Sequence, residues 1–117
     1  MAVQADVRRA MAFIAAKLNG SLATSVYDYS ESKHFLFSGS VGTDHVSVYD
    51  HTQNCHVTGT LPVLFHHGRR QHVDMDLDGN QFSGLDHGTG SRFEGSVSGR
   101  MVSLFDYGQN CRFDYFA

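Results

Sequence analysis

The sequence of 117 residues contains no tryptophan, one proline and two cysteines, and charged residues make up 18% of it. It has no apolar run near the roughly 18 residues that a membrane-spanning helix needs, so we expect no membrane association. Its formal net charge of −3 provides no attraction to a phosphate backbone, so nucleic acid is not an expected partner. Charged residues also lie among the first nine, where a signal peptide would be apolar. We therefore expect a cytoplasmic protein.

Motifs that mark common catalytic and cofactor sites are also missing. The sequence has neither a P-loop nor a dinucleotide-binding glycine pattern, and neither a zinc-protease motif nor a nucleophile elbow. Residues 74–79 begin like a calcium loop, but Leu85 stands where such a loop needs a bidentate glutamate. We therefore predict no cofactor and no metal, and we interpret this stretch as an exposed strand face that enters a turn.

What is present begins with an amphipathic helix. Val7, Met11, Ile14 and Leu18 recur at intervals of four, three and four residues, which places them on one helical face. Asn19 and the glycine after it can end the helix. We predict a helix within residues 1–20.

Beyond residue 24 the helical period disappears, and short β-branched and aromatic runs alternate with turn residues. This pattern is typical of many short strands. The predicted strands cover residues 24–29, 33–41, 45–50, 55–59, 62–67, 70–77, 81–86, 91–97, 101–106 and 110–116.

An internal duplication relates the two halves of this β region. Residues 39–55 align without a gap on residues 95–111, with nine identities in 17 positions. We predict one domain over residues 1–117, with a first β repeat at 24–59, a connecting hairpin at 60–80 and a second β repeat at 81–117. Cys55 and Cys111 hold equivalent places in the repeats, and we expect them to be reduced thiols, although a twofold relation leaves contact between them open.

A shorter unit recurs four times, as YDYSESKHF, YDHTQNCHV, LDHGTGSRF and FDYGQNCRF. If each unit is a hairpin whose two end residues face each other, an acid lies opposite a base in every copy. Because arginine and histidine share the basic place, we interpret these pairs as structural and not as metal ligands. The predicted pairs are Asp28–His34, Asp50–His56, Asp86–Arg92 and Asp106–Arg112.

Eight histidines are the compositional outlier. The one basic cluster lies in the connecting hairpin, and its candidate ligand-binding residues are His66, His67, Arg69, Arg70 and His72. The alternative interpretation of this cluster is a solvated turn. A catalytic set of Asp50, His56 and Cys55 is disfavoured, because neighbouring strand residues point to opposite faces.

The prediction is a mainly β fold: an antiparallel up-and-down barrel, or a two-sheet sandwich, of about 8–10 short strands, preceded by the helix, which caps or plugs one opening. The expected function is non-catalytic binding of a small ligand or a partner protein. One alternative is a metal-dependent or acid–base enzyme that uses the histidine-rich segment. Another is a structural homodimer in which the apolar face of the helix is shared between subunits.

Overall fold

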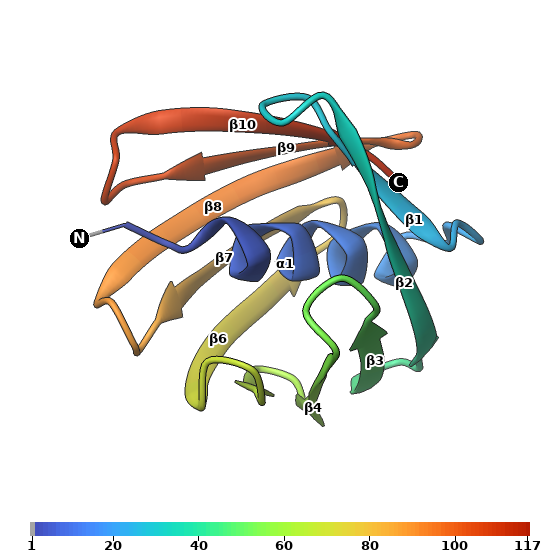
Figure 1. Cartoon of the computed structure of the whole chain (residues 1–117), viewed down its shortest axis with the longest axis horizontal. Coiled ribbons are helices and arrows are strands. Elements are labelled where there is room, and N and C mark those ends of the chain that lie inside the picture. Colours follow the sequence, from blue (N-terminus) through green and yellow to red (C-terminus); the bar gives the residue numbers. More distant parts are fainter. Residues whose placement is uncertain (1) are drawn as a thin grey trace.

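The computed structural model describes residues 2–117 and shows ten antiparallel strands closed into a barrel around one helix (Figure 1). The mainly β architecture is confirmed, in its barrel form. Met1, the first residue of the expected helical segment, lies outside the described residues. The elements are α1 (Ala5–Leu18), β1 (Ser25–Asp28), β2 (Lys33–Val41), β3 (His45–Asp50), β4 (Cys55–Thr60), β5 (Val63–His66), β6 (Gln71–Asp78), β7 (Gln81–Asp86), β8 (Ser91–Ser98), β9 (Met101–Asp106) and β10 (Cys111–Phe116).

Neighbouring strands in the chain are also neighbours in the barrel, and β1 pairs with β10 to close it. Four-residue turns join the strands in five successive pairs, β1–β2, β3–β4, β5–β6, β7–β8 and β9–β10, which are the hairpin units of the sequence, and shorter connections link one unit to the next. The last residue of every turn has a positive φ, between 53° and 75°, which glycine and asparagine adopt most easily. These five residues are Ser32, Asn54, Arg70, Gly90 and Asn110.

The hairpin β5–β6 is therefore a fifth copy of the unit and not a connection of another kind. It has the same turn, but His66 stands where the other four copies have aspartate. The sequence pattern that begins with an apolar residue and Asp hides this copy, because its second residue is changed.

The helix lies inside the barrel along its length and does not sit across one opening, as Figure 1 shows. All residues from Asp6 to Ala16 are buried. The predicted apolar stripe is one face of this helix, and alanines cover much of the rest, so the helix is enclosed on every side. Its apolar face is therefore not available to a second subunit, and that part of the homodimer hypothesis is wrong.

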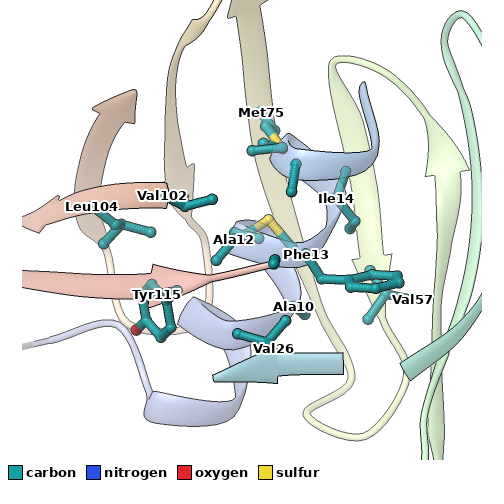
Figure 2. Packing of buried hydrophobic residues seen from close by; sticks show 14 of the residues in the cluster. Ala10, Ala12, Phe13, Ile14, Val26, Val57, Met75, Val102, Leu104 and Tyr115 are labelled. Carbon is teal, nitrogen blue, oxygen red and sulfur yellow. The ribbon is translucent and has the colours of Figure 1, made fainter. Parts of the chain in front are cut away.

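Side chains from the helix and from strands around the barrel form one core (Figure 2). Phe13 of α1 stacks on Phe37 of β2 with ring centroids 4.9 Å apart. Val57 of β4, Met75 of β6 and Leu104 of β9 line the same lumen and are at most 1% exposed. The helix thus fills the space that a ligand would need in a hollow barrel.

The strand register explains why a helix fits inside. Within the β5–β6 hairpin, the last residue of β5, His66, pairs with the first residue of β6, Gln71. On the other side of β6, the last residue of β7, Asp86, pairs with Val73, which lies two residues further along β6. Such stagger tilts the strands and widens a barrel. Eight strands enclose a space that side chains fill, so ten staggered strands leave room for a helix about 10–12 Å across.

The predicted acid–base pairs are wrong, because the observed strand register differs from the predicted register by one residue. Asp50 pairs with Cys55, and His56 pairs with Tyr49. The turn begins directly after the aspartate, so the basic residue is one place too far along to face it. Successive strand residues point to opposite faces, which puts each aspartate in the lumen and each base outside. The register partners of the four predicted bases are Tyr27 for His34, Tyr49 for His56, Leu85 for Arg92 and Phe105 for Arg112.

Candidate functional site

At one end of the barrel, the first strand of each hairpin ends in a polar side chain that points into the lumen. These five side chains are at most 1% exposed. Each accepts a hydrogen bond from a backbone N–H of its own turn, as Asp28 does from Ser30 at 2.9 Å. This contact stabilises the turn. We call the set the buried ring: Asp28, Asp50, His66, Asp86 and Asp106.

The N-terminal part of α1 brings matching charges to two members of the buried ring. Arg9 lies 3.5 Å from Asp28, and Arg8 lies 3.9 Å from Asp106. Each guanidinium also stacks on an aromatic ring, at 3.7 Å from the centroids of Phe35 and Phe113. Buried charges need partners of this kind, so these contacts fix the helix in the lumen.

The helix presents an acid near His66 instead of a base. Asp6 accepts hydrogen bonds from Nε and Nη2 of Arg69, with distances of 3.0–3.2 Å. Burial, the largest single effect, raises the pKa of the Asp6 carboxyl, but the hydrogen bonds and charge of Arg69, together with His66 and a backbone hydrogen bond, hold the pKa below its usual value. Burial lowers the pKa of His66, against the attraction of Asp6 and Asp50. Because the ring residue near Asp6 is histidine, two carboxylates do not meet there.

The structure divides the predicted basic cluster. His66 lies in the buried ring, and Arg69 is bound to Asp6. Arg70 is exposed at the end of its turn. His67 and His72 are exposed on the outer wall, and both contact the Phe65 ring, with centroid distances of 4.8 and 5.0 Å. The five residues therefore do not form one ligand site.

The cysteines are separate, and both are free. Cys55 is buried below the β5–β6 turn, whereas Cys111 is exposed. Burial and the nearby charge of Asp50 raise the pKa of the Cys55 thiol, the opposite of what a nucleophile needs. His56 points outward, so Asp50, His56 and Cys55 do not assemble.

Histidines gather on the outer wall at the ring end of the barrel. Two outward places of the hairpin unit, the first residue of the turn and the second residue of the returning strand, carry histidine in six cases. Strands β2 to β7 each have one such side chain at or next to this rim, and all six are exposed. We call this row the histidine arc: His34, His51, His56, His67, His72 and His87.

A groove of about 490 Å³ lies on the outer wall over β6, β7, β8 and β9. Its outward-facing lining is polar except for one aromatic ring, Phe105, which pairs in register with Glu94. The carboxylate of Glu94 also accepts a 2.5 Å hydrogen bond from the Tyr107 hydroxyl, and this bond raises the pKa of Tyr107. The outward side chains of the groove are Asp76, Asp78, Gln81, Ser83, Glu94, Ser96, Ser103 and Phe105.

Exposed apolar side chains lie across the line where the barrel closes. The two closing strands, β1 and β10, share two register pairs, one of them Tyr27 with Phe116. Phe116 also pairs with Met101 of β9, and the Tyr29 hydroxyl lies 3.9 Å from the sulfur of Met101. Tyr29, Met101 and Phe116 are 36–49% exposed.

No protein-family model, curated protein or solved structure matches the chain. Within residues 2–117, α1 is the one helix, and it is too short to cross a membrane. The same residues contain no group of three or more histidine, cysteine, aspartate or glutamate side chains placed to hold a metal ion. The site must therefore be argued from its own geometry.

Proposed function

We propose that the protein is a non-catalytic binding module whose ligand is a small polyhydroxylated molecule, such as one or two sugar units, bound in the groove over β6–β9. The filled lumen supports this location, since small barrels that bind ligands inside keep that space open. Ligand pockets have volumes of roughly 300–1,000 Å³. The groove falls within this range, with about 490 Å³.

The chemistry of the lining supports a ligand with many hydroxyl groups. Carboxylates such as Asp76 and Asp78 accept hydrogen bonds, and the hydroxyls of Ser96 and Ser103 both donate and accept them. Phe105 offers a ring on which the apolar face of a sugar can pack. No lysine or arginine occurs among the described residues that line the groove, which disfavours an anionic ligand.

The duplicated half of the barrel shows which features make the groove. Tyr49 and Ser47 occupy the places of Phe105 and Ser103, and Ser38 stands where the groove has Glu94. The neighbouring strand there is β1, with four residues, whereas β7 has six. The acidic and amide wall supplied by β6 and β7 therefore has no counterpart in that half.

The test is an NMR titration of the ¹⁵N-labelled protein with a panel of neutral mono- and disaccharides. We expect saturable shifts in the amides of β6–β9, abolished by Phe105→Ala. Tyr49→Ala is the matched control, because it removes the equivalent ring outside the groove, and it should leave the shifts unchanged.

Two results would overturn the proposal. One is the absence of saturable shifts at millimolar concentration for every sugar in the panel. The other is an equal response of the Phe105→Ala and Tyr49→Ala variants. Saturable shifts with a lysine-rich peptide in the absence of any sugar response would show instead that the acidic lining binds a basic partner segment.

A further inference from the structure

The histidine arc is not used by the groove, although it contains six of the eight histidines. Two pairs within it share one register across neighbouring strands, His56 with His67 and His72 with His87. The register of β4 and β5 places His56 beside His67, and the backbone N–H of His67 donates to the His56 carbonyl at 2.9 Å. Both side chains are exposed, and their ring centroids are 6.5 Å apart.

This separation is longer than that of two imidazoles on one metal ion, by a distance that side-chain rotation can close. A zinc–nitrogen bond is about 2.0–2.1 Å long, so each ring centroid lies roughly 3.2 Å from the ion. Two ligating rings then have centroids about 5 Å apart in a tetrahedral site and at most about 6.4 Å apart. Ligation in a tetrahedral site therefore requires the two exposed imidazoles to rotate until their centroids are at least about 1 Å closer together.

Neighbouring groups already restrict both rings. The Tyr49 ring contacts His56 at a centroid distance of 4.7 Å, and the Phe65 ring contacts His67 at 4.8 Å. Nε2 of His67 also lies 2.9 Å from the Thr58 hydroxyl, which ligation through that nitrogen would displace. A pair whose side chains are partly ordered loses less entropy when it binds an ion.

Other pairs in the histidine arc are less suited. At the β4–β5 junction, His66 pairs with Val57, the third residue of β4. At the β2–β3 junction, the corresponding residue Asp50 pairs with Phe37, the fifth residue of β2, so His51 does not lie opposite His34. Nε2 of His51 instead lies 2.8 Å from the Ser38 hydroxyl. At the β6–β7 junction the backbone N–H of His87 donates to the His72 carbonyl at 3.0 Å, as in the β4–β5 pair, but Nε2 of His87 is held by the Asp74 carboxylate at 2.9 Å.

We propose that His56 and His67 form half of a zinc site that a second copy of the chain completes. Zinc in structural sites takes four ligands, and imidazole nitrogen is a preferred donor. One copy offers two of them, in agreement with the lack of any group of three or more ligands within residues 2–117. Two copies related by a twofold axis through the ion supply four, and the exposed parts of Tyr49 and Phe65 lie next to this contact.

The test uses tag-free full-length protein and zinc chloride as the probe, with sedimentation velocity and native mass spectrometry as readouts. We expect half an equivalent of zinc per chain to convert monomer to a dimer that carries one zinc ion, and EDTA to reverse the change. His56→Ala and His67→Ala should each abolish the dimer. The double variant His34→Ala, His51→Ala removes two histidines from the same places of other units and should leave it intact.

Replacing zinc with Co²⁺ adds a direct readout, because four-nitrogen tetrahedral Co²⁺ absorbs strongly in the visible range. The proposal would be overturned if the protein bound zinc but stayed a monomer, or if the control double variant lost the dimer to the same extent as His56→Ala and His67→Ala. Far-UV circular dichroism of each variant shows whether it has kept the fold, and these exposed substitutions should not change it.

Discussion

Replacing His66 with aspartate restores the residue found in the other four hairpins, yet we expect it to destabilise the protein. Substitutions toward a consensus commonly add about 0.5–2 kcal/mol to the free energy of unfolding. In the wild type, Nδ1 of His66 accepts a hydrogen bond from the Arg69 backbone N–H at 3.1 Å. The new carboxylate could accept the same hydrogen bond. The difference is that it would lie near the buried Asp6 and not near an arginine of the helix.

The magnitude follows from the burial of this site. His66 is 0% exposed and Asp6 is 4% exposed, so water does not screen the two carboxylates. Arg69 lies near both groups and offsets part of their repulsion, so we expect His66→Asp to lower the free energy of unfolding by about 1–3 kcal/mol, less than the roughly 3–5 kcal/mol of a buried charge without a partner. His66→Asn is the matched control, since it has nearly the same shape as aspartate without the charge. Its cost should be smaller, because it reflects the smaller side chain alone.

The assay is urea unfolding at pH 7, with a double-mutant cycle that adds Asp6→Asn. Removing the acid of the helix should recover about 1–3 kcal/mol in the His66→Asp background. Equal stabilities of His66→Asp and His66→Asn would refute the charge argument. A His66→Asp protein more stable than the wild type would show that the consensus of the repeat outweighs the helix.

Three further predictions test the rest of the fold. Phe13→Ala, which removes the ring stacked on Phe37, should lower the free energy of unfolding in urea by about 3–5 kcal/mol, whereas Lys17→Ala at the half-buried end of the helix should have a small effect. Arg70→Gly should raise the melting temperature, because the arginine has a φ of 54° and relief of this strain is worth about 1 kcal/mol. Gly90→Arg introduces the same strain at the equivalent place of another turn and should lower the melting temperature. The pKa of Asp6 in the folded protein lies below its usual value near 3.8, so this carboxylate stabilises the fold above pH 4, and the stabilisation is lost as the pH falls through the folded pKa. Acid unfolding of Asp6→Asn should therefore depend less on pH than that of the wild type, and an identical pH profile would contradict this.

The strands could be predicted from sequence because each is short, alternates in polarity and borders a four-residue turn at one end. The location of the helix could not. Its stripe of Val7, Met11 and Ile14 predicts one buried face, but the alanines of its other faces are small enough to be buried as well. Burial on every side depends on the width of the barrel, and that width is set by register slips between hairpins that no single hairpin reveals.

The candidate sites were harder to predict for a related reason. The groove and the histidine arc consist of residues that alternate with core residues on neighbouring strands, so they meet only once the register is known. The predicted opposition of Asp50 and His56 failed by a single residue, and that one step moves a side chain from the outer wall to the lumen. The fifth copy became clear only from the structure, in which Arg70 shares the positive φ of Asn54 and Asn110, because arginine is not a residue type that signals this conformation.

The same five-unit repeat explains how one sequence pattern supports two surfaces with different demands. Inward places must match the helix, which is not repeated, so the buried ring departs from its consensus where the helix carries Asp6 instead of an arginine. Outward places are free of that constraint, and they differ by sector: histidine on β2 to β7, and serine with carboxylates over β6–β9. Substitutions in the buried ring should therefore change stability first, whereas exposed substitutions in the groove or the histidine arc should change binding with little effect on stability.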